Sequence, residues 1–407
     1  MSSPTILLGY ELATGRAVRI PLRHMAVTGI TQMSGKTTTL EALIGRSGLR
    51  AVTFITKRGE GSFGGDTPAR TIPAYFRPGC GWQEIVELLE VCTGKRVSDG
   101  MLPYVMRACN GLPVEAKQKN KAGEVDIRCD KCGTAHFEGV PCASIAPRNL
   151  AEVASNLRRL EAEADGKAEA NRLLLLCGYF TLTLAQVELL PTTGQLELHA
   201  GLNCMDLSAY PVALQALVIA ATLDHINQCE AGVVVLIPEA WQFIPREGHT
   251  ACKAAVERMA RKGACLDNYL WIDSQDLAGI DIVARKAVSC YLLGVQREAN
   301  EVQRTLKHLP ADVRKPSARG IMELRRGEFW AAWDAELHPV YVQPAWLDDD
   351  PERARSYAKY SHPESFVARP AHAVSLRRPS RRENRGKSKS TALPAVSDSA
   401  PITGRVQ

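Results

Sequence analysis

Short apolar runs alternate with amphipathic stretches along most of the chain, and this alternation predicts a mixed α/β fold. Residues 5–10 and 17–22 flank a Thr14-Gly15 turn and predict an N-terminal β-hairpin. Further strands are expected at 25–28, 51–55, 196–207, 232–237, 269–272 and 288–294. Helices are expected at 82–92, 149–164, 212–226 and 250–262. A last hairpin is expected at 322–333, with its turn at Gly327. Strands that alternate with helices in this order are typical of a mostly parallel sheet.

This rhythm breaks twice, and the breaks divide the chain into five parts. Between residues 96 and 147 glycine and lysine become frequent and three cysteines gather near a histidine, which indicates an insertion. Near the C-terminus large apolar residues become scarce, so that segment is expected to be a disordered tail. The predicted parts are a hairpin at 1–24, a first core segment at 25–95, the insertion at 96–147, a second core segment at 148–345 and a basic tail at 346–407.

Composition excludes several classes of protein. With 407 residues, 45% of them hydrophobic, the chain is long and apolar enough for a sizeable core, so whole-chain disorder and a small disulfide scaffold are excluded. The longest apolar stretch, residues 211–223, is too short to span a bilayer, and the N-terminus lacks the pattern of a signal peptide. Twelve cysteines, mostly scattered, suit reduced thiols, and we therefore expect a cytoplasmic protein without a transmembrane segment.

The positive charge is concentrated in the tail. Residues 366–407 contain nine Lys or Arg and two acidic residues, whereas the whole chain carries +6, so the preceding body is close to neutral. Such a tail can hold nucleic acid without sequence preference by neutralising phosphates and releasing counterions. A solvated tail that only aids solubility remains an alternative.

The clearest chemical signal is the segment Gly29-Ile-Thr-Gln-Met-Ser-Gly35-Lys36-Thr37-Thr38. A predicted strand precedes it and a predicted helix follows, which is the setting in which backbone amides and a helix N-terminus hold phosphate groups. The Walker A pattern has four residues between its glycines, whereas five lie here, so the additional residue either bulges outward or distorts the loop. The candidate nucleotide-binding residues are Gly29, Thr31, Ser34, Gly35, Lys36, Thr37 and Thr38, with the Thr37 hydroxyl as the candidate Mg²⁺ ligand.

Two other predicted strands end in polar residues. Val233-Val-Val-Leu-Ile237-Pro238-Glu239 is an aliphatic strand followed by an acid, as in a Walker B motif, but Pro238 stands where the first of two acids is usual. Only Glu239 therefore remains to polarise a water molecule. The strand at 269–272 leads into Asp273-Ser-Gln275, where Gln275 is a candidate sensor of the γ-phosphate. Lys57, after the strand at 51–55, either lines the same site or merely caps its strand.

Together these motifs resemble the HerA–FtsK branch of P-loop ATPases, which includes the conjugative type IV secretion ATPases. The resemblance runs over about residues 25–335 without the insertion, and it includes Arg261-Lys-Gly263 before the strand that ends at Gln275. It implies a RecA-like sheet, ATP with Mg²⁺, and a homo-oligomeric, hexameric ring that translocates DNA. By this resemblance Lys36 contacts phosphates, Glu239 the attacking water and Gln275 the γ-phosphate, and Arg261 is a candidate for charge stabilisation across a subunit boundary.

The insertion carries a possible metal site. Cys129 and Cys132 have the spacing at which two thiolates face one cation, and His136 and Cys142 follow closely enough to complete a structural Zn²⁺ site. Cys109 is an alternative fourth ligand. A redox pair is disfavoured, because the surrounding pattern is not thioredoxin-like.

The sequence leaves three functions open. The first is a Mg²⁺-dependent ATPase that translocates or remodels DNA. The second is a nucleotide-binding switch or scaffold with little hydrolysis, which the proline at 238 favours. The third is a DNA-binding zinc module attached to an ATPase body that has lost activity.

Overall fold

The computed structural model describes residues 4–31, 34–58, 63–65, 67–77, 79, 81–112, 117–119, 125–127, 147–190, 192–193, 195–248 and 250–360. The predicted zinc ligands Cys129, Cys132, His136 and Cys142, and residues 361–407 of the tail, lie outside these ranges. Two residues of the phosphate-loop candidate, Gln32 and Met33, do so as well. None of the described helices has both the length and the hydropathy that crossing a bilayer would require.

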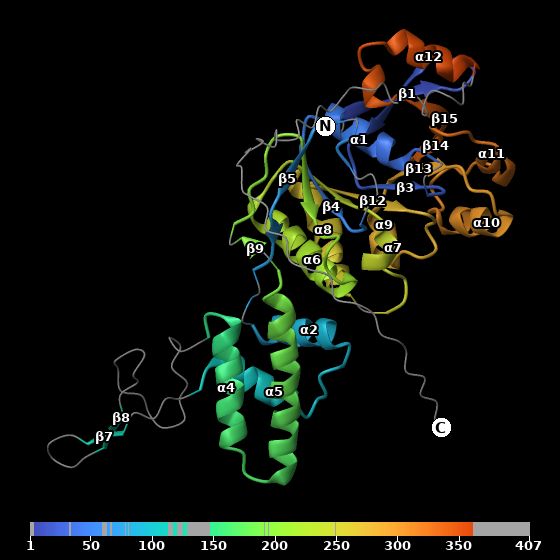
Figure 1. Cartoon of the computed structure of the whole chain (residues 1–407). Helices are drawn as coiled ribbons and strands as arrows, with labels where there is room; N and C mark the ends of the chain where they lie inside the picture. Colours follow the sequence, from blue (N-terminus) through green and yellow to red (C-terminus); the bar gives the residue numbers. More distant parts are fainter. Residues whose placement is uncertain are drawn as a thin grey trace, which may run out of the picture. The chain divides into compact units, whose positions relative to one another are not determined.

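One large sheet of 11 strands organises the described part of the chain (Figure 1). Its parallel part is, in spatial order, β5 (Ala69–Ile72), β10 (Leu202–Asp206), β4 (Arg50–Ile55), β11 (Val233–Ile237), β12 (Tyr269–Ser274), β3 (Met25–Thr28) and β13 (Cys290–Gly294). Antiparallel strands then extend the sheet through β14 (Glu328–Trp333), β15 (Glu336–Val342), β1 (Thr5–Glu11) and β2 (Ala17–Pro21). The predicted mixed α/β fold with a mostly parallel central sheet and an N-terminal hairpin is thus confirmed.

Both faces of the central parallel strands β11, β12, β3 and β13 are buried, because helices cover each of them. On one face α1 (Lys36–Ser47) contributes Leu40, Leu43 and Ile44 to a cluster with alternate residues of the strands, among them Trp271. The other face packs on α6 (Val212–Cys229), α8 (Ala251–Lys262) and shorter helices: α7 (Ala240–Phe243), α9 (Ile282–Ala287), α10 (Ala299–His308) and α11 (Ala318–Met322). Burial on both faces explains why the strands read as continuous aliphatic runs such as Val233–Ile237.

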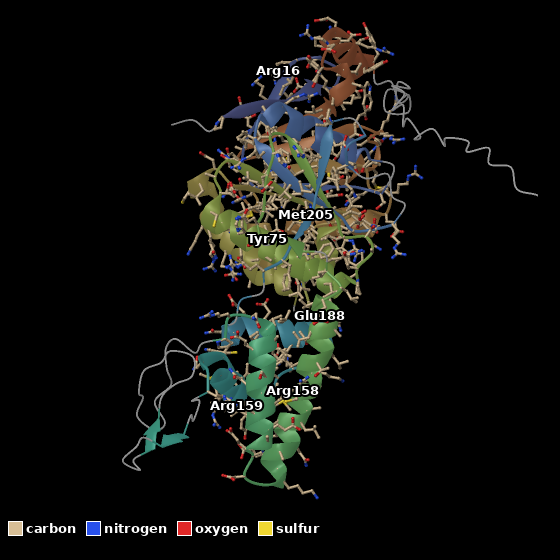
Figure 2. The ribbon with its side chains drawn as sticks, turned by 60° about the vertical axis from the view of Figure 1, so that its left-hand side comes forward. Arg16, Tyr75, Arg158, Arg159, Glu188 and Met205 are labelled. Carbon is tan, nitrogen blue, oxygen red and sulfur yellow. The ribbon has the colours of Figure 1, made fainter. Side chains whose placement is uncertain are left out.

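A helical bundle is inserted between β6 (Ala74–Tyr75) and β9 (Thr192–Thr193), which pair in parallel. It contains α2 (Trp82–Thr93), α3 (Leu102–Asn110), α4 (Leu150–Ala162) and α5 (Lys167–Val187), and α2 also contacts α6 and α8. Figure 2 labels Arg158 and Arg159 on α4, which lies beside α5, and Met205 among the strands of the sheet. We predicted an insertion limited to residues 96–147. The inserted bundle is larger, because α2 lies before that range and α4 and α5 lie after it. Within that segment β7 (Lys117–Lys119) and β8 (Val125–Ile127) form an antiparallel pair.

The end of the described chain corrects our tail boundary. We predicted disorder from residue 346, but a 3-10 helix (Ala345–Leu347) and α12 (Pro351–Tyr360) follow β15. Ala354 and Ala358 of α12 pack on Tyr10 and Tyr341 in a small apolar cluster. The two alanines are four residues apart, and this spacing gives a charged helix one narrow apolar stripe.

Two other sequence predictions were wrong in detail. The last hairpin does not turn at Gly327; its strands are β14 and β15, joined near Asp334, whose φ is +48°. Residues 323–326 contain three charged side chains and one leucine, which is too polar for a strand in this sheet. The predicted strand at 196–207 is limited to β10, because Gly201 with φ +80° interrupts the extended backbone.

Candidate functional site

The loop after β3 joins the centre of the sheet to α1. Gly29 has φ +143° and Gly35 has φ +82°, both in the region that favours glycine, and Gly35 caps the N-terminus of α1. A Cβ on Gly29 would lie 2.9 Å from the Ser34 side chain, so the loop closes on itself at this point. Ser34 secures the closure, because its Oγ donates to the Ile30 carbonyl at 2.9 Å. The observed strand–loop–helix unit confirms the setting that the sequence predicted for these residues.

Lys36, the first residue of α1, points into the buried end of this loop. Its Nζ donates to the carbonyl oxygens of Gly29 at 2.8 Å and Ser274 at 3.4 Å, and it lies 3.3 Å from Asp273 Oδ1. The Lys36 and Asp273 side chains are only 6% and 9% exposed. The ammonium group therefore links the loop to the carboxyl end of the neighbouring strand β12.

Glu239 lies directly beyond β11, on the same edge of the sheet. Its backbone adopts the left-handed conformation with φ +46°, and its side chain is buried. Trp241 Nε1 donates to Glu239 Oε2 at 2.7 Å, and Lys57 Nζ lies 3.3 Å from Glu239 Oε1. Of the two alternatives for Lys57, this ion pair favours the one in which it lines the site.

Asp273 is the residue of this cluster to which the sequence analysis gave no role. Burial raises its pKa to about 6, the negative charge of Glu239 adds to that increase, and the attraction of Lys36 opposes it. No hydrogen-bond donor among the described residues is aligned with its Oδ1. The only sequence signal for Asp273 was its place as an acid near the end of an apolar strand. Its ion-pair partner Lys36 is more than two hundred residues away in the chain, so the sequence did not indicate that the two meet.

The remaining candidates are placed less centrally. Gln275 follows β12 with an exposed side chain, while its carbonyl accepts from Gly29 N at 3.3 Å and from Gln296 Nε2 at 2.9 Å. Thr37 and Thr38 are half-buried in the first turn of α1, and the Thr31 hydroxyl is buried without a hydrogen-bond partner among the described residues. The structure therefore brings Gln275 to the loop mainly through its backbone.

Arg261 is not part of this cluster within one chain. It is the next-to-last residue of α8, a helix on the opposite face of the sheet from α1, and its side chain is 69% exposed. Its guanidinium group lies 2.6 Å from Glu257 one helical turn earlier. The predicted contribution across a subunit boundary stays a prediction.

The zinc site also stays a prediction. Cys109, the alternative ligand, lies on α3 and is buried in the apolar core. Within the part of the chain that the structure describes, no group of three or more His, Cys, Asp or Glu side chains is arranged to hold a metal ion.

The cluster nevertheless suits a nucleotide with Mg²⁺. The loop combines the Lys36 ammonium with the N-terminus of the 12-residue helix α1, and these are the two groups that hold phosphates in P-loops. The nearby Thr37 hydroxyl and the carboxylates of Asp273 and Glu239 are hard oxygen donors, the type that Mg²⁺ prefers. The Asp273 oxygen that faces the Lys36 ammonium shows that this position accommodates a cation.

Comparison with solved structures shows which fold surrounds this cluster. VirB4 of Thermoanaerobacter pseudethanolicus matches with a TM-score of 0.57 over 84% of this chain and 96% of that chain, at 11% identity. The chain has the fold of VirB4. The resemblance to HerA–FtsK-type P-loop ATPases predicted from the motifs is thus confirmed at the level of the fold.

Weaker matches carry no argument about this chain. The bacterial conjugative coupling protein TrwB matches with a TM-score of 0.48 at 11% identity, over 83% of this chain and 91% of that one. The genome packaging NTPase B204 of Sulfolobus turreted icosahedral virus 2, solved with ATP-γ-S, matches with a TM-score of 0.35 at 9% identity, over 79% of this chain and 100% of that one. No family model matches the sequence, and no curated protein does.

Proposed function

We propose that this chain binds ATP with Mg²⁺ at the loop between β3 and α1 and hydrolyses it, working as a homo-oligomeric ring on DNA. The observation that carries the proposal is the cluster at the carboxyl edge of the sheet, where Lys36 at the start of α1 and Glu239 after β11 both neighbour the buried Asp273 of β12. The VirB4 fold supports the same choice.

Each side chain has a distinct task in this mechanism. Lys36 exchanges its present oxygen partners for the terminal phosphates, and the amides at the start of α1 hold the remaining phosphate oxygens. Glu239 orients and polarises the attacking water, and Trp241 fixes the position of its carboxylate. When bound with the nucleotide, Mg²⁺ would offset the charge on the phosphates, with Thr37 among its ligands. The exposed side chain of Gln275 would contact the γ-phosphate.

A nucleotide-binding switch is the second candidate, and Pro238 favours it. This residue stands in place of the carboxylate that usually precedes the catalytic acid. If no other group replaces that carboxylate, nucleotide binding without turnover is expected. In the switch, ATP would change partner contacts while hydrolysis stayed negligible.

Variants of Lys36 and Glu239 separate these functions. For Lys36→Ala we expect about 10- to 100-fold weaker ATP binding, because charged hydrogen bonds to phosphate are lost. For Glu239→Gln we expect unchanged affinity but turnover about 10²- to 10⁴-fold lower, as for loss of a general base. The measurements are ATP-γ-S affinity by titration calorimetry and phosphate release with and without DNA. Asp206→Asn, an exposed acid at the end of β10, is the matched control and should leave both unchanged.

The outcomes discriminate between the proposals. Turnover in the wild type that is lost in Glu239→Gln supports the ATPase. Binding without measurable turnover under either condition supports the switch. A wild-type protein without affinity for nucleotide, or a Lys36→Ala variant with normal affinity, contradicts both.

A further inference from the structure

Asp273 occupies a position in the sheet that the register defines. Strands β11 and β12 run parallel with Ile237 opposite Ile272, so Asp273, the next residue of β12, lies at the level of Pro238, the residue that follows β11. The neighbour on the other side of β12 is β3, where Asp273 pairs with Val27 just before the phosphate-binding loop. Asp273 is therefore one strand from Pro238 and one strand from the loop.

The two positions also share a face of the sheet. Along β11 and β12 the residues two positions earlier, Leu236 and Trp271, both belong to the apolar cluster beneath α1. Because side chains alternate along a strand, Asp273 within β12 belongs to that same face, and the same alternation continued one residue past β11 assigns position 238 to it as well. The 3.3 Å ion pair between Asp273 and Lys36 of α1 confirms this direction for Asp273.

We propose that Asp273 supplies, from β12, the carboxylate that Pro238 does not supply from β11, and that it holds the Mg²⁺ shell of the bound nucleotide. This inference rests on the proposed function and adds to it the residue that completes the site. It also removes the main reason for regarding the chain as a switch without turnover.

The charges around Asp273 support this assignment. In the present arrangement Lys36 is the cation beside Asp273, but bound phosphates would take Lys36 for themselves. The other nearby ammonium, Lys57, lies 3.3 Å from Glu239. Without Lys36, the buried Asp273 carboxylate would keep only the weaker attraction of Lys57, which Glu239 shares, and this is unfavourable for a buried charge. A divalent cation that arrives with the nucleotide restores the balance.

The rival explanation is an ion-pair lock. In that case Asp273 only competes with phosphate for Lys36, and its removal would strengthen nucleotide binding whether or not a metal ion is present. The two explanations therefore differ in the dependence of affinity on Mg²⁺ and not in affinity alone.

The test uses the full-length chain with Asp273→Asn, Pro238→Asp and the double variant, and Asp206→Asn as the control. ATP-γ-S affinity is measured by calorimetry in EDTA and over a Mg²⁺ titration, and Mn²⁺ binding to the nucleotide complex is measured by electron paramagnetic resonance. For Asp273→Asn we expect unchanged or tighter binding in EDTA, with Mg²⁺ and Mn²⁺ affinity of the complex about 10- to 100-fold weaker. Pro238→Asp should restore most of this loss in the double variant and change metal affinity less than about 3-fold by itself.

Several results would overturn the inference. A change of the same factor in EDTA and in Mg²⁺ for Asp273→Asn would indicate a lock or a purely structural residue. A gain of about tenfold or more in metal affinity for Pro238→Asp alone would show that Asp273 does not supply the missing carboxylate in the wild-type site. This variant tests the role of Asp273 even if Asp273→Asn does not fold. A wild-type chain that binds no ATP-γ-S in either condition contradicts the proposed function itself, whereas the other two results leave that function intact.

Discussion

His24 lies at the N-terminal edge of the parallel strands, where its ring is buried against β12. The backbone N–H of Leu270 donates to its Nδ1 at 2.9 Å, so this nitrogen serves as an acceptor in the fold. Burial lowers the pKa of His24 below its ordinary value of 6.5. The fold therefore favours the neutral imidazole, whereas the unfolded chain takes up a proton near pH 6.5.

The preference of the fold for neutral His24 makes the protein more stable as the pH rises. Because the unfolded state binds more protons, the contribution of His24 is complete above about pH 6.5 and is lost as the pH falls toward its folded pKa. The variant His24→Asn keeps a hydrogen-bond acceptor but does not titrate. In this pH window we expect it to decrease the slope of the unfolding free energy against pH by up to about 1.4 kcal/mol per pH unit. Urea unfolding at several pH values measures both slopes. Equal slopes in the two proteins would contradict the prediction.

At the scale of elements, α12 shows how a charged helix is attached to the sheet by very few apolar side chains. Ala354 and Ala358 are buried against β1 and β15, and most other residues of the helix are exposed or half-buried. Such a helix can detach without unfolding the remaining sheet, because local stability follows local burial.

Ala358→Glu tests that attachment. The larger charged side chain has no space or partner between the tyrosines of this cluster, so we expect α12 to be destabilised by at least about 1 to 3 kcal/mol. Hydrogen exchange should then lose protection in residues 351–360 while the central strands keep theirs. Lys359→Glu, at an exposed neighbouring position, is the control. Uniform loss of protection across the sheet would show that α12 is not a separate unit.

The elements also show what the sequence was able to predict. Aliphatic runs and glycine positions located β3, α1 and β11, because these signals lie within a few neighbouring residues. The ion pairs of Asp273 and Lys57 depend on which strands become neighbours and in which register, and a single sequence does not encode that locally. The same limit applies to the helical bundle, whose members from 82–93 and 150–187 meet only in the folded chain.

At the scale of the whole molecule, the positive charge is concentrated in one segment, apart from the residues of the candidate nucleotide site. The basic residues of 366–407 add a positive charge of seven to a body that is nearly neutral. If this segment binds DNA by counterion release, its contribution depends on the number of charges and not on their exact side chains.

Replacing Arg377, Arg378, Arg381 and Arg382 by glutamine in the full-length chain tests this dependence. Each phosphate contact contributes about 0.9 to the slope of log affinity against log salt concentration, so we expect the slope for duplex DNA to become shallower by up to about 3 to 4. Fluorescence anisotropy at several salt concentrations measures it. The same four positions changed to lysine should keep the wild-type slope, because the charge is unchanged. Since these substitutions leave Lys36, Asp273 and Glu239 intact, ATP-γ-S affinity without DNA should also stay at the wild-type value. An unchanged slope in the glutamine variant would assign DNA attachment to the body and leave the tail with an effect on solubility alone.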